Sequence, residues 1–326
     1  MTTMRRTLGC SGIEVSLPAL GGNVFGPPRL DASATREVIA AALDLGVDFI
    51  DTANVYNSGE SERLLGQALG ARRQKVVLAT KFNLTNWDRQ EPVAHYIRQQ
   101  AEESLSRLST DYIDLYQLHF PNGSADVADL LAAAGELVAE GKIRAFGVCN
   151  YSAWRLAETV QLSTSEGLAA IATVQNYYHL LARQVEAEVL PYAQRAQISV
   201  LPYHPLGGGF LTGKYRQGQP APSGTRGANG SRIIQTMSTP ENWRLLDQLT
   251  KIAADHGHTI GELAIAWLAN QPIVGAVIAG ASNVDQLRSN VTACGWALTQ
   301  DVLDEIDRIV APNGIASPER MPYAAG

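Results

Sequence analysis

Short apolar runs alternate with stretches of helical spacing along most of the chain, at intervals of roughly thirty residues, which is typical of strand–helix units. Eight of these runs are predicted to be strands: 17–20, 47–50, 76–80, 112–118, 143–148, 171–174, 198–202 and 274–279. Helical patterns lie between them at 33–45, 60–69, 92–108, 126–139, 152–161 and 185–196. Such alternation implies parallel strands covered by helices, and eight units favour a closed barrel over an open, doubly wound sheet. The sequence therefore predicts an α/β protein with a (β/α)8 TIM barrel fold.

Two segments depart from this alternation. Residues 5–15 alternate around Gly9-Cys10-Ser11-Gly12 and predict an N-terminal β-hairpin. Between the seventh and eighth strands, residues 207–238 form a long loop rich in Gly, Pro, Ser and Arg, and helical patterns near 240–255 and 260–269 follow it. A loop of this length usually has a function, so we expect a flap over a ligand. No composition shift marks a boundary, and residues 1–326 are expected to form a single domain.

The composition is that of an ordinary globular protein, with 45% hydrophobic and 18% charged residues. A formal net charge of -6 argues against a nucleic-acid partner. The three cysteines, Cys10, Cys149 and Cys294, lie far apart without metal-ligand spacing, and this low, odd count is typical of a reducing compartment. No signal peptide or membrane span is predicted, because polar residues interrupt the most apolar windows. We therefore expect a cytoplasmic protein without a metal site or a membrane partner.

Polar or aromatic side chains stand at or just past the ends of six predicted strands. They are Asp51, Lys81, His119, Asn150, Gln175 and Tyr203. Each has an ordinary structural explanation when taken alone, such as a turn, a cap or a buried histidine with its hydrogen bonds satisfied. In a (β/α)8 barrel, however, the carboxyl ends of the strands meet at one face, which is where active sites lie. The joint placement therefore predicts one assembled site.

Asp51, Lys81 and His119, together with Tyr56 five residues after Asp51, form a set that suits proton donation to a carbonyl oxygen. A free phenol has a pKa of about 10, and a nearby ammonium group lowers that pKa by favouring the phenolate. The carboxylate would keep the ammonium charged and in place, while the imidazole offers an N–H group to the oxygen. On these grounds we expect the pKa of Tyr56 to be lowered by Lys81.

Five stretches of the chain carry a resemblance to a known family. They are Asp51-Thr52-Ala53-Asn54-Val55-Tyr56 with 59–62, Leu78-Ala79-Thr80-Lys81, 112–119, 141–148 and Val174-Gln175-Asn176. With the hairpin and the long loop, they make the sequence resemble the aldo-keto reductase superfamily over almost its whole length. The resemblance implies a (β/α)8 barrel, NADPH bound in an extended form, and reduction of an aldehyde or ketone substrate.

The resemblance also implies roles for individual residues. Tyr56 would be the proton donor, Lys81 would lower its pKa, Asp51 would support Lys81, and His119 would orient the carbonyl group. Asn150 and Gln175 match positions that hold the nicotinamide carboxamide, and Tyr203 matches the aromatic residue that stacks on the nicotinamide ring. The remaining positions implied to bind the cofactor are Leu206, Gly209, Gly280, Ser282, Asn283, Gln286 and Asn290.

Three residues depart from the pattern of the family. Cys149 and His204 stand where serine is common, and Ser282 stands where many relatives place an arginine for the 2′-phosphate. NADH is therefore the alternative to NADPH. Four aromatic residues are candidates for apolar substrate contacts: Phe25, Phe82, Trp87 and Phe120. The oligomeric state is not predicted.

Other functions fit the sequence less well. A glycoside hydrolase needs two carboxylates facing the sugar, and Asp51 alone ends a predicted strand in a suitable way. Residues 208–215 nearly match a phosphate-binding P-loop, but Tyr215 replaces the Ser or Thr that binds Mg²⁺. His256 and His258 have no further metal ligand near them in the sequence. The main alternative to a reductase is a cofactor-sensing subunit of a potassium channel, because such proteins have the same fold.

Overall fold

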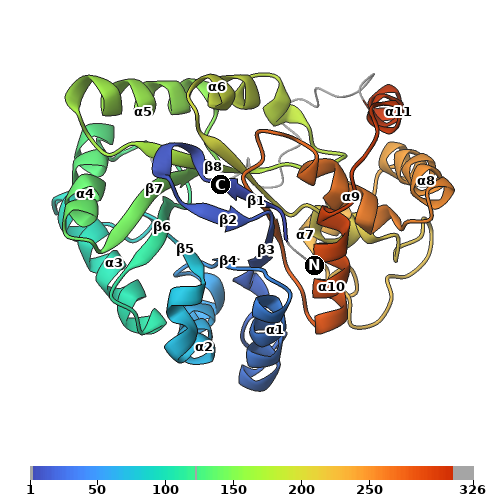
Figure 1. The fold of residues 1–326 in the computed structure, drawn as a ribbon, viewed down its shortest axis with the longest axis horizontal. Coiled ribbons are helices and arrows are strands. Elements are labelled where there is room, and N and C mark those ends of the chain that lie inside the picture. Colours follow the sequence, from blue (N-terminus) through green and yellow to red (C-terminus); the bar gives the residue numbers. More distant parts are fainter. Residues whose placement is uncertain (1–2, 122, 311–326) are drawn as a thin grey trace.

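The computed structural model describes residues 3–121 and 123–310, and its centre is a closed barrel of eight parallel strands (Figure 1). The strands are β3 (Pro18–Gly21), β4 (Phe49–Asp51), β5 (Val77–Phe82), β6 (Ile113–Leu118), β7 (Ile143–Cys149), β8 (Ile171–Tyr177), β9 (Ser199–Tyr203) and β10 (Val277–Ala279). The ring closes where β10 pairs with β3, with Val277 opposite Pro18. The predicted (β/α)8 barrel is confirmed.

Side chains of alternate strand residues point into the barrel or out towards the helices, as the period of a β-strand requires. Phe49, Ala79 and Leu115 belong to a small apolar cluster inside the barrel, whereas their neighbours Ile50 and Leu78 belong to the larger core under the helices. Asp51, Lys81 and Gln117 each follow one of these three inner residues by two positions, so they lie on the same faces of β4, β5 and β6. The alternation therefore places a polar layer directly above the apolar one, at the carboxyl end of the barrel.

The two-stranded hairpin of β1 (Arg5–Thr7) and β2 (Glu14–Ser16) lies across the opposite end of the barrel (Figure 1). Leu8 and Val15 from this segment are fully buried and join the inner apolar cluster. The hairpin thus closes the end of the barrel that is far from the polar layer, and its prediction is confirmed.

Helices surround the barrel on its outer side (Figure 1). Those between successive strands are α1 (Ala32–Asp44), α2 (Glu60–Leu69), α3 (Val93–Leu108), α4 (Val127–Ala139), α5 (Ala153–Glu166) and α6 (Val189–Arg195), and α10 (Val284–Cys294) follows the last strand. Helix α1 begins at Ala32, one residue before the predicted range 33–45. Asp31 caps it, because the backbone of Asp31 is extended and its carboxylate accepts a hydrogen bond from the Ala34 N–H at 2.8 Å.

The segment between β9 and β10 contains the long loop and the two predicted helices, α8 (Pro240–Asp255) and α9 (Ile260–Ala269). It also contains a short helix, α7 (Arg232–Met237), that the sequence analysis did not identify. The same is true of α11 (Gln300–Val310), although its buried residues Val302, Ile306 and Val310 have helical spacing. The predicted helix at 185–196 begins later than expected, because a 3-10 turn at Gln184–Glu186 precedes α6.

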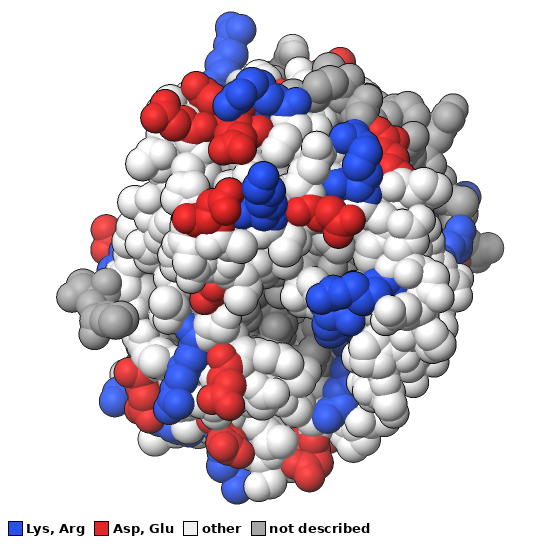
Figure 2. Space-filling view, turned by 90° about the vertical axis from the view of Figure 1, so that its right-hand side faces the viewer, with Lys and Arg blue, Asp and Glu red and all other residues white. Residues whose placement is uncertain are grey.

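The surface carries charges of both signs. Figure 2 shows the right-hand side of Figure 1, where acidic and basic side chains are interspersed over the face. Among the described residues, no helix is both long and apolar enough to cross a membrane.

Candidate active site

Lys81 lies near the end of β5, and its side chain points into the barrel with no exposure to solvent. Its ammonium group donates hydrogen bonds to Asp51 Oδ2 at 2.5 Å and to the Thr52 carbonyl at 2.8 Å. Asp51 is the last residue of β4 and is itself only 2% exposed. A buried charge is tolerated when it is paired and hydrogen-bonded, so each of these groups stabilises the other in a charged form.

The second oxygen of Asp51 is held by two amide groups inside the barrel. Gln117 Nε2 donates to Asp51 Oδ1 at 3.2 Å, and Gln175 Nε2 donates to the same oxygen at 3.1 Å. Cys149 also lies here, with its thiol 3.8 Å from Gln117 Oε1. Gln117 was missed in the sequence analysis, although it precedes His119 by two residues on a predicted strand. The structure thus connects the side chains of Gln175 and Cys149 to the polar layer beneath the mouth of the barrel.

Tyr56 lies above the buried ion pair, in the turn that follows β4. The Lys81 ammonium is 5.1 Å from the centroid of the Tyr56 ring, and the ring of His119 meets that of Tyr56 edge-on with centroids 5.8 Å apart. The turn is held by Asn57, whose side-chain amide donates to the Phe25 carbonyl at 2.8 Å and whose φ of 48° is left-handed. The structure therefore brings together Asp51, Tyr56, Lys81 and His119 from three adjacent strand ends.

Two opposing effects act on the pKa of Tyr56. Burial raises this pKa above its ordinary value, and the effect of burial outweighs the charge of Lys81, which lowers the pKa as expected. The net rise comes from burial, which the sequence analysis did not consider. Burial also lowers the pKa of Lys81, but the charges and hydrogen bonding around it, chiefly from Asp51, give a net rise. Tyr56 is thus a protonated phenol beside a firmly charged ammonium group.

His119 is neutral at physiological pH. Burial, followed by the charge of Lys81, lowers its pKa to about 3. The ring stacks on Phe120 with centroids 4.5 Å apart, and its Nδ1 has no hydrogen-bonding partner among the described residues. A neutral imidazole beside a phenol offers a hydrogen-bond donor without competing for the proton of the phenol.

Asn150 and Tyr203 are linked across the mouth of the barrel. The Asn150 amide nitrogen donates to the His119 carbonyl at 2.9 Å, and the Tyr203 hydroxyl donates to Asn150 Oδ1 at 2.8 Å. Asn150 adopts a left-handed backbone with φ of 60°, directly after β7. These contacts fix the ring of Tyr203 at the edge of the site that contains His119 and Tyr56.

Positive charge gathers near the glycine-rich segment that follows β9. Gly209 has a φ of 111°, and a Cβ at this position would lie 3.5 Å from the Lys214 ammonium. Leu206 is half-buried and directly precedes Gly207, Gly208 and Gly209. Burial, and then the charges of Arg226 and Arg29, lower the pKa of His204 to about 4. His204 is therefore neutral, and the cations here are Lys214, Arg226 and Arg29.

The remaining residues of the predicted cofactor set lie around the N-terminus of α10. Asn283 caps this helix by accepting a hydrogen bond from the Gln286 N–H at 2.9 Å, and the Gln286 side chain accepts one from the Ser282 N–H at 2.9 Å. Gly280, Ser282, Asn283 and Gln286 are exposed, whereas Asn290 is buried one turn further in. The first turn of the helix thus presents neutral polar groups to solvent.

Two of the four substrate candidates are in the wrong place. Phe82 follows the inward-pointing Lys81, so it points outward, where it stacks on Tyr116 with no exposure. Phe25 is also fully buried, in the core under the helices. Phe120 is 41% exposed beside His119, and Trp87 is half-buried in the loop after β5. We therefore retain Phe120 and Trp87 as candidates and drop Phe25 and Phe82, which offer no surface to a substrate.

No cluster of metal-ligating side chains occurs within the part of the chain that the structure describes. His258 instead stacks on Trp296 with ring centroids 3.8 Å apart. The three cysteines are free thiols, of which Cys149 and Cys294 are buried.

Comparison with known proteins gives consistent matches. Residues 19–311 match the model of the Aldo/keto reductase family. The chain is 35% identical to "Aldo-keto reductase YhdN" of Bacillus subtilis over 315 residues, covering 94% of this chain and 92% of that protein. It is 33% identical to "Putative voltage-gated potassium channel subunit beta" of Schizosaccharomyces pombe, with coverage of 94% and 92%. It is 32% identical to "Probable voltage-gated potassium channel subunit beta" of Oryza sativa subsp. japonica, with coverage of 94% and 96%.

Proposed function

Because the chain belongs to the aldo/keto reductase family, we propose that it is an NADPH-dependent oxidoreductase that reduces an aldehyde or ketone to the alcohol. The observation that carries this proposal is the buried Lys81–Asp51 ion pair beneath Tyr56, with neutral His119 beside it. That arrangement supports a phenol as a proton donor, and a carbonyl oxygen is the acceptor that it suits.

Each of the four residues has a distinct part in this mechanism. As the carbonyl oxygen gains negative charge, Tyr56 donates its phenolic proton to it. Lys81 stabilises the phenolate that is left, and Asp51 holds Lys81 charged at 2.5 Å. His119, being neutral, donates a hydrogen bond to the carbonyl oxygen and orients it. The net rise in the pKa of Tyr56 keeps the proton on the phenol before the reaction.

The residues at the mouth of the barrel fit a nicotinamide dinucleotide. When bound, the reduced nicotinamide supplies the hydride. Asn150, Gln175 and Tyr203 would hold the nicotinamide. Leu206 and Gly209 would contact the diphosphate, and the cations Lys214, Arg226 and Arg29 near them suit its negative charge. The adenosine end would be held by Gly280, Ser282, Asn283, Gln286 and Asn290, where the N-terminus of α10 favours an anion.

We further propose that NADPH is preferred over NADH by a smaller margin than in relatives with arginine at position 282. Ser282 and Asn283 offer neutral groups to a 2′-phosphate, and Asp285 adds a negative charge to the first turn of α10. Arg288 lies one turn further in, with its guanidinium 3.9 Å from Asp285. The negative charge of Asp285 therefore partly cancels the positive charge that Arg288 could offer to a 2′-phosphate.

The experiment that tests the reaction is the substitution Tyr56→Phe. We expect kcat to fall at least about a hundredfold, because the alkoxide has lost its proton donor, while NADPH binds with an unchanged Kd. The matched control is Tyr116→Phe, which removes a buried hydroxyl without a partner among the described residues, on the outer side of the barrel. Near-normal turnover by Tyr56→Phe would remove this residue from the mechanism.

A second candidate function is that of a cofactor-sensing subunit of a channel. Relatives named as channel subunits are 33% and 32% identical over nearly the whole chain, and a binding protein of this kind can retain the residues of an active site. The two functions differ in turnover. Carbonyl-dependent loss of NADPH absorbance over a panel of aldehydes and ketones supports the enzyme, whereas tight NADPH binding without turnover of any carbonyl supports the sensor.

A further inference from the structure

Gln117 belongs to the polar layer, but neither the proposed proton transfer nor the proposed cofactor site gives it a role. It lies on β6, two residues before His119, and its side chain has no exposure to solvent. Its strand neighbours are Lys81 on β5 and Gly147 on β7. A Cβ at position 147 would lie 3.3 Å from Gln117 Cγ, so the glycine leaves room for the longer side chain. Gln117 is thus held inside the barrel directly beside Lys81.

The hydrogen bonds of the Gln117 amide determine which of its two ends faces Asp51. An ionised carboxylate only accepts hydrogen bonds, so Nε2 is the end that lies 3.2 Å from Asp51 Oδ1. The other end, Oε1, accepts from the Gln175 amide at 3.4 Å and from the Cys149 thiol at 3.8 Å. Burial raises the pKa of this thiol, so the thiol keeps the proton that it donates. The two donors to Oε1 therefore favour the orientation in which Nε2 faces Asp51.

These contacts hold the carboxylate of Asp51 in one position. Oδ2 accepts the 2.5 Å hydrogen bond from Lys81, and Oδ1 accepts from both Gln117 and Gln175. The two amides extend from β6 and β8, which are fixed in the barrel. A rotation of the carboxylate away from Lys81 would break the hydrogen bonds to both amides, and no solvent is present to replace them. The carboxylate is therefore held with Oδ2 towards Lys81.

Gln117 and Gln175 differ in what else they are expected to bind. Gln175 is also expected to hold the nicotinamide carboxamide, so its amide would be shared between Asp51 and the cofactor. The amide nitrogen of Gln117 has Asp51 as its acceptor within the described part of the chain, and its side chain is closed off from solvent. Gln117 can therefore hold Asp51 in the same way with and without the cofactor.

We propose that Gln117 is a positioning residue for the proton transfer. It holds the carboxylate of Asp51 so that Oδ2 stays at Lys81, whose ammonium group stabilises the Tyr56 phenolate. Gln117 touches neither the substrate nor the cofactor, and it acts through Asp51 and Lys81. This role rests on the proposed carbonyl reductase function.

The kinetic test is the substitution Gln117→Met, because methionine is unbranched, of similar length and offers no hydrogen-bond donor. We expect kcat to fall at least about tenfold, since the reacting groups are no longer held in place. The Kd of NADPH, measured by quenching of protein fluorescence, should stay within about twofold of wild type. The control is Thr173→Val, which removes a hydroxyl group from the same face of β8 as Gln175; that hydroxyl is buried without a partner among the described residues. This variant should leave kcat unchanged.

A second variant, Gln117→Glu, separates positioning from simple packing through its pH profile. The new carboxyl group has the shape of the amide and can donate a hydrogen bond to Asp51 only while it is protonated. Two ionised carboxylates at this distance repel each other. At pH 5.5, kcat of Gln117→Glu should therefore exceed that of Gln117→Met, and its ratio to the wild-type kcat should fall as the pH is raised to 8.5. An equal loss in both variants that does not depend on pH overturns the proposal.

Urea denaturation tests the contact between Gln117 and Asp51 without any turnover. In the wild-type protein, Gln117→Met should raise the equilibrium constant for unfolding at least about tenfold, because a hydrogen bond to a charged group is lost. In the background Asp51→Leu/Lys81→Met, where the amide has no carboxylate to bind, the same substitution should not raise it. If the protein reduces no carbonyl, the proposed function fails, while these measurements still decide whether Gln117 acts on Asp51. An equal effect in both backgrounds, or a normal kcat for Gln117→Met, overturns the role of Gln117.

Discussion

The ion pair of Lys81 and Asp51 should dominate the stability of the mouth of the barrel, and a double-mutant cycle can measure this. The variants are Lys81→Met, Asp51→Asn and the double variant. Methionine keeps much of the length of the lysine side chain, so that Lys81→Met removes the charge with little change in packing. Asparagine at position 51 can still accept the hydrogen bonds that Gln117 and Gln175 now donate to Asp51 Oδ1 at 3.2 and 3.1 Å.

The expected magnitudes follow from burial. Lys81 is 0% exposed and Asp51 is 2% exposed, so either charge left alone would lie in a medium that solvates it poorly. Removing one partner of such a pair typically costs about 3–5 kcal/mol, whereas replacing both is often close to neutral. We therefore expect each single variant to lose about 3–5 kcal/mol in the free energy of unfolding. The double variant should lose much less than the sum, which gives a coupling energy of at least about 3 kcal/mol.

Urea denaturation at neutral pH gives the four free energies of unfolding, provided that the m-values agree. Arg98 and Glu140 supply a matched control, because their side chains also approach to 2.6 Å but are 32% and 39% exposed. The corresponding cycle of Arg98→Met and Glu140→Gln should give a coupling energy below about 1 kcal/mol.

The reasoning is refuted if the Asp51–Lys81 double variant loses as much as the two single variants together. Such additivity would mean that each charge is compensated by groups other than its partner. A coupling energy no larger than that of the exposed control pair would lead to the same conclusion.

The other predictions concern acid stability and cofactor choice. The pKa of His119 and that of His179 are lowered to about 3, and that of His204 to about 4, and burial is the main cause in each case. The unfolded chain, in which these side chains have a pKa of about 6.5, therefore binds more protons than the folded chain between about pH 4 and 6.5. Stability is fully present above this window and falls as the pH is lowered through it, by about 1.4 kcal/mol per pH unit for each histidine. Urea denaturation from pH 7 to 4.5 should show a shallower fall for His179→Asn than for wild type; equal slopes would contradict the assignment of a neutral, buried His179. For cofactor choice, Ser282→Arg should tighten NADPH binding by about 1–3 kcal/mol and leave NADH nearly unchanged, as titration of both cofactors against both proteins would show. Equal gains for the two cofactors would mean that residue 282 does not face the 2′-phosphate.

The barrel and its polar layer could be predicted from the sequence because both depend on local order along the chain. Strand–helix alternation determines the architecture, and a strand that ends in a polar residue places that residue at the mouth. The outward direction of Phe82 could also have been predicted, because side chains alternate along a strand and Phe82 follows the inward-pointing Lys81. The cap at Asp31 and the helix α11 also had local signals, in a carboxylate before the helix and in apolar residues at helical spacing.

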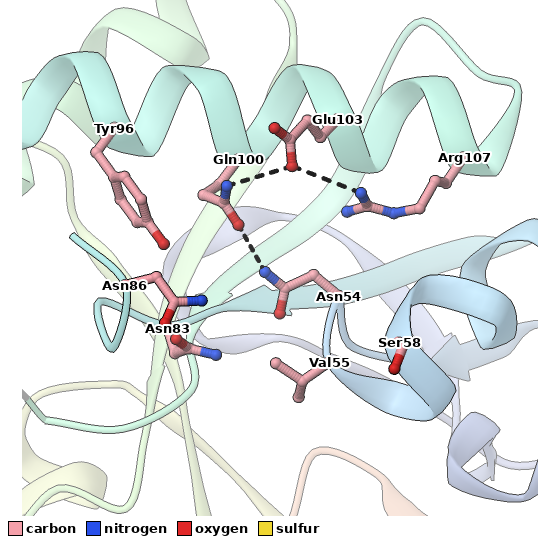
Figure 3. Close-up of a pocket in the computed structure, with 9 residues that line it drawn as sticks. All are labelled: Asn54, Val55, Ser58, Asn83, Asn86, Tyr96, Gln100, Glu103 and Arg107. Atoms are coloured by element: carbon pink, nitrogen blue, oxygen red, sulfur yellow. Dashed lines mark hydrogen bonds and ion pairs between the residues drawn. The ribbon is translucent and has the colours of Figure 1, made fainter.

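Other properties of the site depend on distances across the barrel, which no local pattern contains. Gln117 and Asp51 are 66 residues apart in the sequence and lie on β6 and β4, with β5 between them, and they meet because both side chains point into the barrel. The shift in the pKa of Tyr56 is the balance between the effect of burial, which is larger, and the opposing effect of Lys81. The direction of this shift can be predicted only when the burial of the phenol is known. The cavity of about 400 Å³ between α3 and the loops that follow β4 and β5 (Figure 3) likewise depends on how the helix packs against these loops.

The strands of the barrel are not paired equally around the ring. Five residue pairs join β8 to β9, but within the named strands β9 and β10 are joined by the single pair of Tyr203 and Ile278, supplemented by a bridge between Val200 and Val274. Local opening costs least where few backbone hydrogen bonds and contacts must be broken. The ring is therefore mechanically weakest along this line, and Tyr203 lies on it. Any widening of the barrel mouth would therefore begin beside the aromatic side chain of Tyr203, which we expect to stack on the nicotinamide. The more extensively paired strands around Lys81 and His119 would keep their spacing.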